Sequence, residues 1–285
     1  EMTKRRNWAP YLLLAPSAIF LLIFFAVPML QSFQLAFQDA DGNWTLNTLQ
    51  RMFADANFHL GLKVTVTLVV LVIPIQFVLA MSMALIINQR LRGNSLWLYV
   101  YALPLAISEL AAGLVWVSIF QQRGWLNSIL MNLGLIETPI IWQSSESYWT
   151  LIGIILVTEA WRATSIIMII LVAGLQSIPD EYIEAAEVYG ATLWQRVRRV
   201  MLPMLRPALQ VALILRIILA IQVFATVIAL AGSALTTLTS QSWVWSTAVQ
   251  DDNMAAAYAM VVLMLSIGST IAVLWLLPVR DEQQV

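Results

Sequence analysis

Four ionisable residues, Glu109, Glu159, Arg162 and Arg216, interrupt stretches of the chain that are otherwise almost entirely apolar. Near the centre of a membrane helix one such charge costs about 2.5–3.5 kcal/mol, so each needs a partner or water. The two acids balance the two bases, and Glu159 and Arg162 are three positions apart, so they share a helix face and can pair. Two interpretations stay open: ion pairs that hold helices together, or groups that line a polar cavity for a hydroxyl-rich solute. The second is favoured because charges within membranes usually border a pathway.

Motifs for catalysis and for nucleotide binding are absent from the sequence. The two lysines, Lys4 and Lys63, do not follow a glycine, so a phosphate-binding Gly-Lys-Ser/Thr loop cannot occur. Without cysteine, and with the single histidine His59, the chain cannot form thiol-based or zinc-ribbon sites. We therefore expect neither enzyme activity nor a cofactor in this chain, and any energy-driven work would depend on another subunit.

The composition is that of an integral membrane protein. Of the 285 residues, 60% are hydrophobic and only 11% are charged, and the mean hydropathy is +0.81. Soluble domains carry about 25% charged residues, which a water-facing surface requires. The net charge of −1 offers no basic surface for nucleic acid. At about 20 apolar residues per helical crossing, the length allows about six spans.

The positions of the charges delimit six apolar segments. We predict membrane-spanning helices near residues 11–37, 64–88, 95–120, 148–176, 207–231 and 255–278. These runs lack the alternation of apolar and polar residues that marks the strands of a membrane β-barrel. The predicted fold is therefore all-α and integral to the membrane, with six transmembrane helices in a single transmembrane domain over residues 1–285.

The distribution of basic residues predicts the orientation. With the N-terminus in the cytoplasm, ten Lys and Arg fall in inner segments, three in outer segments and two within helices. The inner ones are Lys4, Arg5, Arg6, Arg90, Arg92, Arg196, Arg198, Arg199, Arg206 and Arg280, and the outer ones are Arg51, Lys63 and Arg123. Cytoplasmic loops carry the excess of basic residues, so we expect both termini inside. Loops 38–63 and 121–147 would lie outside, the latter with a short helix beginning near Trp125.

Loop 177–206, expected on the cytoplasmic side, is the most polar segment of the chain. Pro179 followed by two acids suits a first helical turn. Gly190 then permits a turn, and a second helical stretch ends near Pro203. The alternative is an amphipathic helix that lies on lipid headgroups. The acids of this loop argue against that alternative, because an anionic inner leaflet would repel them.

The segment from Glu184 to Ala191, followed by Leu202-Pro203 and Pro207, resembles the EAA loop of ABC-importer permeases. The family pattern is Glu-Ala-Ala, three residues, a glycine and, further on, a Leu-Pro pair; Tyr189 stands where Asp is usual. Other stretches are similar to the sugar-importing branch of the maltose, trehalose and glycerol-phosphate type. They are Leu103-Pro104, Ala112–Trp116, Gly124–Asn127, Glu159–Arg162 and Ala173–Pro179. The resemblance covers nearly the whole chain.

This resemblance implies a permease subunit that moves a sugar or a related polyol across the inner membrane. The implied partners are a second homologous permease in a heterodimer, two ATPase subunits that bind ATP and Mg²⁺, an extracytoplasmic sugar-binding protein and the lipid bilayer. The residues implied to contact an ATPase subunit are Glu184, Ala185, Ala186 and Gly190. Loop 177–206 would then be a coupling loop between the fourth and fifth spans.

The resemblance also implies that the spans on either side of loop 177–206 contact the sugar. The candidate pathway residues are Glu109, Glu159, Arg162, Ala163, Arg216, Ala220 and Val223, of which the two alanines could leave room for a sugar ring. The alternative function is an ion-coupled secondary transporter with proton sites at Glu109 and Glu159. Such transporters tend to show internal repeats, and none is visible in this sequence.

Overall fold

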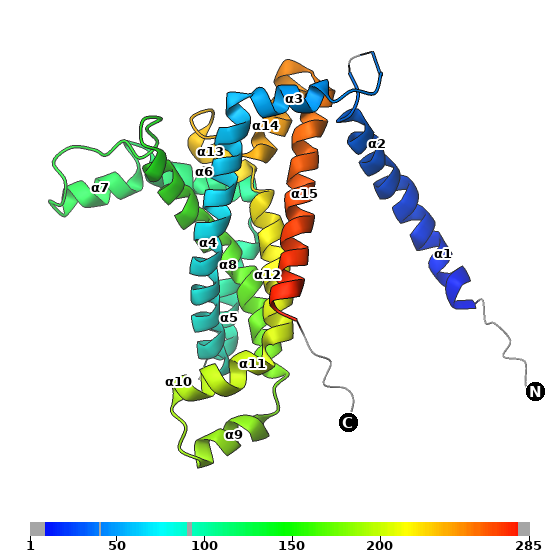
Figure 1. Cartoon of the computed structure of the whole chain (residues 1–285). Helices are drawn as coiled ribbons and strands as arrows, with labels where there is room; N and C mark the ends of the chain where they lie inside the picture. The colour runs from blue at the N-terminus through cyan, green and yellow to red at the C-terminus, as the bar shows by residue number, and fades with distance from the viewer. Residues whose placement is uncertain (1–8, 40, 90–92, 279–285) are drawn as a thin grey trace, which may run out of the picture. The chain divides into compact units, whose positions relative to one another are not determined.

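The computed structural model describes residues 9–39, 41–89 and 93–278, and these residues fold mainly into helices (Figure 1). The chain divides into two compact units, residues 1–58 with 241–261 and residues 59–240 with 262–285, here called the first and the second unit. Several basic residues used to predict the orientation lie outside the described residues: Lys4, Arg5, Arg6, Arg90, Arg92 and Arg280.

The first unit begins with an apolar helical stretch. It comprises α1 (Ala9–Leu21), a π-helical turn (Leu22–Ala26) and α2 (Val27–Leu35), and no side chain of Tyr11–Leu35 is buried. The rest of the unit is α3 (Asn47–Ala54), the end of α14 (Leu238–Val244), a π-helical turn (Trp245–Val249) and the start of α15 (Asp252–Leu276). Tyr258 donates to the carboxylate of Asp55 at 2.8 Å, and Arg51 pairs with Asp251 at 3.0 Å. These two contacts join α3 to the start of α15.

The second unit is a bundle built around α8 (Tyr148–Gln176). The helices beside α8 are α4 (Ala56–Asn88), α5 (Asn94–Ala102), a 3-10 turn (Leu103–Ala106), α6 (Glu109–Phe120), α12 (Arg206–Ile221) and α13 (Ala225–Ala231). The helix α7 (Trp125–Asn132) follows α6 and confirms the short helix predicted in loop 121–147. In the most apolar stretch of α8, 56% of the residues are buried, which is why this helix forms the centre of the unit.

Two apolar clusters surround α8, one toward each of its ends. The first contains Leu151, Ile152, Ile154 and Ile155 of α8 with Val64, Leu68, Val223 and Val227. The second contains Ile167, Met168, Leu171 and Leu175 of α8 with Val197, Met201 and Leu205. Between them, α8 carries the buried polar residues Thr158 and Glu159. A polar layer therefore lies between two apolar layers, and it contains Glu159, one of the charges predicted to sit within the membrane.

Four described helices are long and apolar enough to cross a membrane. They are Tyr11–Leu35, Ala56–Asn88, Tyr148–Gln176 and Asp252–Leu276. Two bent pairs would bring the number to six: Asn94–Ala106 with Glu109–Asn132, at 97°, and Leu193–Met204 with Arg206–Ile221, at 73°. The predicted all-helical membrane fold is confirmed for the described residues, although two of the predicted spans are not continuous helices.

The first interruption falls in the predicted span 95–120. Pro104 lacks an N–H group and its ring crowds the preceding turn, so the helix gives way to a short 3-10 turn. A new helix, α6, then begins at Ser108, whose hydroxyl accepts a hydrogen bond from the backbone N–H of Ala111 at 3.2 Å. The proline and the capping serine together explain the bend.

The second interruption falls in the predicted span 207–231 and is separate from the bend before Arg206. Here α12 ends at Ile221 and α13 begins at Ala225. No glycine or proline lies at this break. Its cause is a carboxylate from another helix, described with the site below.

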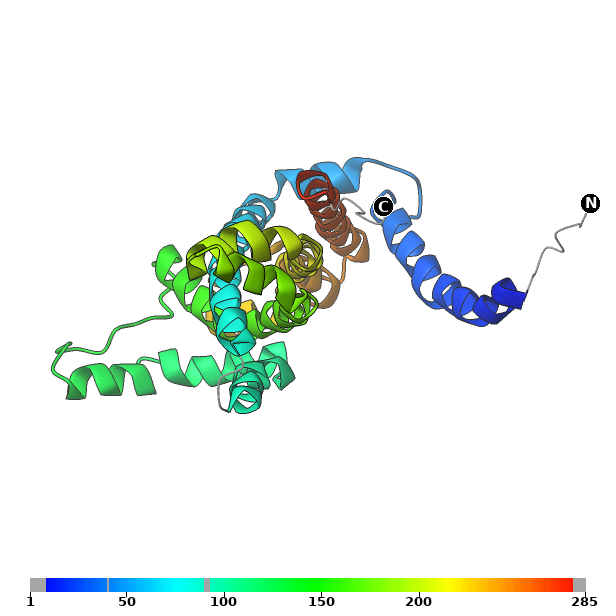
Figure 2. The ribbon, with the colours of Figure 1, turned by 90° about the horizontal axis from the view of Figure 1, so that it is seen from below.

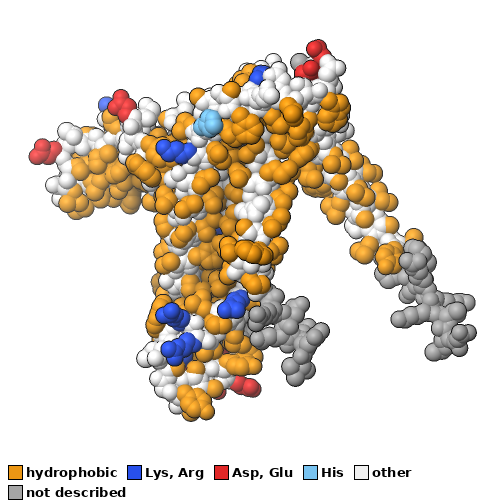
Figure 3. All heavy atoms as spheres, viewed as in Figure 1, with side chains coloured by type: hydrophobic (Ala, Val, Ile, Leu, Met, Phe, Trp, Pro, Cys, Tyr) orange, Lys and Arg blue, Asp and Glu red, His pale blue; other side chains and the backbone are white. Residues whose placement is uncertain are grey.

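Loop 177–206 folds as the predicted helix–turn–helix. Its elements are α9 (Asp180–Val188), α10 (Leu193–Arg196), a π-helical turn (Val197–Met201) and α11 (Leu202–Met204). Gly190, with φ of +75°, makes the turn between the two limbs. The segment lies across the lower end of the second unit, as the two views in Figures 1 and 2 agree. Lys and Arg side chains gather at this end, whereas the flank over α4 is mainly apolar (Figure 3).

Candidate functional site

Glu159 lies on the central helix α8, is only 3% exposed, and accepts hydrogen bonds from three side chains. Arg162, one turn further along α8, reaches both carboxylate oxygens at 3.1 Å. From α12, Arg216 donates to Oε2 at 3.0 Å, and from α13 the hydroxyl of Thr226 donates to Oε1 at 2.9 Å. The carboxylate of Glu159 therefore joins α8, α12 and α13.

Arg216 is the most completely buried charge of this group, with 1% exposure. Its Nε donates to Oε1 of Gln76 on α4 at 2.5 Å, and the Gln76 amide nitrogen donates to the backbone carbonyl of Glu159 at 2.7 Å. These bonds close a circuit through α4, α8 and α12. Among the described residues, the Nη1 of Arg216 has no hydrogen-bond partner.

Glu109 acts differently from the other three charges. Its Oε1 accepts hydrogen bonds from the backbone N–H groups of Phe224, at 2.9 Å, and of Thr226, at 3.2 Å. A carboxylate on α6 thus caps the N-terminus of α13, where unpaired N–H groups and the helix dipole favour negative charge. This cap explains the break in the predicted span 207–231, because it takes up N–H groups that a continuous helix would pair with carbonyls.

The four predicted charges form one connected network. Thr226 is the bridge, since its backbone bonds Glu109 and its side chain bonds Glu159. The two carboxylates and two guanidinium groups sum to zero, as a group enclosed in apolar surroundings requires. The structure thus brings Glu109 close to the other three charges.

The space beside the network is small. A cavity of about 10 Å³ is lined by Leu68, Val72, Glu159, Arg216, Ala220 and Val223. This volume holds about one water molecule, and a sugar ring does not fit. Ala220 and Val223 line the cavity, whereas Ala163, which is 1% exposed, is not among its lining residues. The chain by itself thus shows a network that holds five helices together, and the role of these residues in a pathway stays a prediction.

Gln76 and Thr226 were not found from the sequence. Gln76 is the only amide between positions 64 and 87, and a lone amide in so apolar a run could have drawn notice. Thr226 carried no signal, because a threonine in a membrane helix can bond a carbonyl of its own helix. Neutral polar residues reveal much less about buried networks than charges do.

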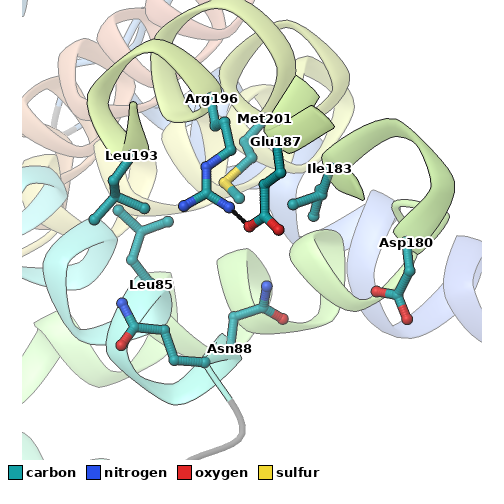
Figure 4. A pocket seen from close by; sticks show the side chains of 9 residues that line it. Leu85, Asn88, Asp180, Ile183, Glu187, Leu193, Arg196 and Met201 are labelled. Atoms are coloured by element: carbon teal, nitrogen blue, oxygen red, sulfur yellow. Dashed lines mark ion pairs between the residues drawn. The ribbon is translucent and has the colours of Figure 1, made fainter. Parts of the chain in front are cut away.

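The helix α9 of loop 177–206 has two faces. Glu184 and Ala185 are exposed, Ala186 is half-buried, and the tip that follows exposes Val188 by 86% and Tyr189 by 91%. The opposite face borders a hollow of about 590 Å³ whose lining residues are Leu85, Asn88 and Gln89 of α4 and the turn after it, Asp180, Ile183 and Glu187 of α9, and Leu193, Arg196 and Met201 beyond (Figure 4). At the edge of this hollow Glu187 forms an ion pair with Arg196.

An apolar helical chain with a buried charged network and a helix–turn–helix exposed at one end is an integral membrane component of a transport system. Residues 65–278 match the family described as binding-protein-dependent transport system inner membrane components, and the chain belongs to this family. A probable ABC transporter permease protein of Brucella suis biovar 1 (strain 1330) is 30% identical over 96% of this chain and 98% of its own length.

Further similarities support the assignment. The trehalose/maltose transport system permease protein MalF of Thermococcus litoralis is 28% identical over 78% of this chain and 76% of its own length. A crystal structure of a bacterial ABC transporter involved in the import of the polysaccharide alginate contains a chain with the same fold. That chain has a TM-score of 0.79 and 23% identity, with 94% of this chain and 96% of that one covered. The chain is thus a permease subunit of an ABC importer.

Proposed function

We propose that this permease subunit imports a sugar or a related polyol as one half of a heterodimer with a second, homologous permease. Its relatives include permease proteins named for trehalose and maltose, and for xylose and arabinose. The observation that carries the proposal is the exposed outer face of α9, where the Glu-Ala-Ala sequence and an apolar tip leave a surface for another subunit.

One of two ATPase subunits, which bind ATP and Mg²⁺, would dock on that face. Glu184 is exposed and has no ion-pair partner among the described residues, so it is free to pair with a basic residue of an ATPase subunit. Ala185 and Ala186 are small enough for close approach, and Gly190 forms the turn beside them. The chain would contribute the surface, and the ATPase subunits would contribute the chemistry.

The sugar pathway would run beside the charged network, between this chain and the second permease. The cavity next to Glu159 and Arg216 is too small for a ring, but Trp161 is 37% exposed and the side chain of Arg162 is 18% exposed. These two neighbours on α8 would face the pathway, and charge-assisted hydrogen bonds from Arg162 would bind sugar hydroxyls. Behind them, Glu109, Ala163, Ala220 and Val223 would form the supporting wall.

The protein is an inner-membrane component, and we propose that both its termini and loop 177–206 face the cytoplasm. Loops 38–63 and 121–147 would face outward, where an extracytoplasmic sugar-binding protein docks. The chain has no cysteine, so single cysteines at Asp41 and Arg196 can be labelled with a membrane-impermeant thiol reagent. Labelling at 196 but not at 41 in intact cells would show that the orientation is opposite to the proposed one.

The test of the function is transport by the purified complex. Chains that co-purify from the native membrane should include ATPases and a second permease, and proteoliposomes containing them should take up sugar with ATP and binding protein but no ion gradient. Uptake that requires an ion gradient instead would support the ion-coupled alternative. Glu184→Lys should abolish uptake and weaken ATPase co-purification, whereas the matched change Glu137→Lys, on the exposed loop 121–147, should leave ATPase co-purification unchanged.

A further inference from the structure

The ion pair between Glu187 and Arg196 lies on the side of α9 that faces away from the proposed ATPase surface. Asp180, Ile183 and Glu187 are three and four residues apart and line the hollow. Glu181, Glu184 and Val188, with the same spacing, lie on the exposed face. One short helix thus presents a docking face outward and an ion pair inward (Figure 4).

The hollow leaves α9 poorly supported along its inner face. It has a volume of about 590 Å³, and its opposite wall is the end of α4, with Leu85 and Asn88. Ile183 packs against the apolar cluster around Met201 and so holds the start of α9. Toward the end of α9, Glu187 forms an ion pair with Arg196 across to α10. A load applied to the outer face of α9 would push the helix into the hollow unless this contact resisted it.

Arg196 is firmly placed, because α10 is fixed at both ends. At its start, the Thr192 hydroxyl and the Gln195 side chain form a reciprocal capping box. At its end, the chain continues into a π-helical turn whose Val197 and Met201 are buried in the apolar cluster. The side chain of Arg196 itself is only 19% exposed. From there the chain leads through α11 into α12, which carries Arg216 of the buried network.

We propose that Glu187 and Arg196 are positioning residues that tie α9 to α10, so that movement of the docking face is passed to α12 instead of being lost in the hollow. Neither residue touches the substrate. The inference rests on the proposed function, because it assumes that ATPase subunits act on the outer face of α9. It adds that the inner face determines how much sugar is moved for each ATP hydrolysed.

The test is the ratio of sugar transported to ATP hydrolysed in proteoliposomes of the complete importer. Glu187→Gln removes the charge and should lower this ratio about 3- to 5-fold, the upper range for a partly exposed ion pair, while ATPase co-purification is unchanged. Reversing the pair, with Glu187→Arg and Arg196→Glu together, should restore most of the ratio. The matched control is Arg199→Gln, which removes an exposed charge from the π-helical turn, does not line the hollow, and should leave the ratio unchanged.

A merely structural role gives a different result, because a poorly folded permease lowers transport and hydrolysis together and leaves their ratio unchanged. An unchanged ratio in Glu187→Gln, or no recovery in the reversed pair, would overturn the proposal. If Glu187→Gln does not assemble, Glu187→Asp tests the same contact with a side chain one methylene shorter. A wild-type complex that fails to transport sugar with ATP would instead overturn the proposed function, so the two failures are distinguishable.

Discussion

Glu159 and Arg216 pair between α8 and α12 with side-chain exposures of 4% and 1%, whereas Glu187 and Arg196 pair between α9 and α10 with exposures of 54% and 19%. Both pairs join a carboxylate to a guanidinium group across two helices. In the first, water is excluded and additional bonds from Gln76, Thr226 and Arg162 saturate most of the polar atoms. In the second, water competes with the contact, and among the described residues no further side chain bonds either partner.

The difference in surroundings changes what each pair contributes. A buried pair that loses one partner leaves an uncompensated charge, which destabilises a protein by about 3–5 kcal/mol. A surface pair is worth about 0–1 kcal/mol and is weakened by salt. The buried pair is therefore suited to holding helices in one arrangement, and the exposed pair to a contact that is made and broken as the protein moves.

The largest expected effect comes from removing one member of the buried pair. Arg216→Met should lower the free energy of unfolding by about 3–5 kcal/mol, because Glu159 loses a charged partner and Gln76 loses its donor. Adding Glu159→Gln should recover part of the stability but no transport. Thermal unfolding of the purified variants, with Arg123→Met in an exposed loop as the control, measures the changes in stability, and uptake by proteoliposomes measures transport. Normal stability of Arg216→Met would show that the network does not hold the helices.

The second effect concerns the cap that Glu109 provides to α13. Glu109→Ala removes both bonds to the backbone of Phe224 and Thr226 and should destabilise the protein by about 1–2 kcal/mol, as the loss of a helix cap does. Glu109→Gln keeps an acceptor oxygen and should lose less. Equal losses of stability in the two variants, measured by thermal unfolding, would mean that the charge of Glu109, and not its hydrogen bonds to α13, stabilises the protein.

The sequence predicted the parts of this site that carry charge. Glu159, Arg162 and Arg216 stood out because ionised groups are rare in apolar runs, and the structure brings all three together. The break in 95–120 had a visible signal in Pro104. Loop 177–206 was predictable because its proline, acids and glycine mark a helix, a turn and a second helix by local rules.

The rest depended on contacts between distant residues. The break after Ile221 has no local signal, because its cause, Glu109, lies more than a hundred positions earlier. Gln76 and the carboxylate of Glu159 meet Arg216 only once α4, α8 and α12 are packed. The size of the cavity beside them is set by how closely Leu68, Val72 and Ala220 pack, which no pattern of residue types determines.

A smaller effect is expected at the turn between the limbs of loop 177–206. Gly190 has φ of +75°, and an added Cβ would meet no atom within 4 Å, so Gly190→Ala strains only the backbone. The left-handed conformation costs an alanine about 1 kcal/mol. Transport should fall modestly, whereas Gly153→Ala on α8, which also meets no atom within 4 Å and has no positive φ, should be neutral or slightly stabilising. Normal transport by Gly190→Ala would show that the turn tolerates change.

The smallest effect on stability should come from the exposed pair, and salt distinguishes it from the buried one. Glu187→Gln should change the free energy of unfolding by less than about 1 kcal/mol, because the Glu187 side chain is half exposed. Raising the ionic strength from about 0.05 M to about 0.5 M shortens the range of charge interactions severalfold in water but hardly affects pairs from which water is excluded. The wild type and Glu187→Gln should therefore differ less at high salt in the ratio of sugar transported to ATP hydrolysed, while the instability of Arg216→Met persists. If salt did not change the difference between the wild type and Glu187→Gln, the pair of Glu187 and Arg196 would have to be buried in the assembled importer. It would then act as a buried ion pair, like Glu159 and Arg216.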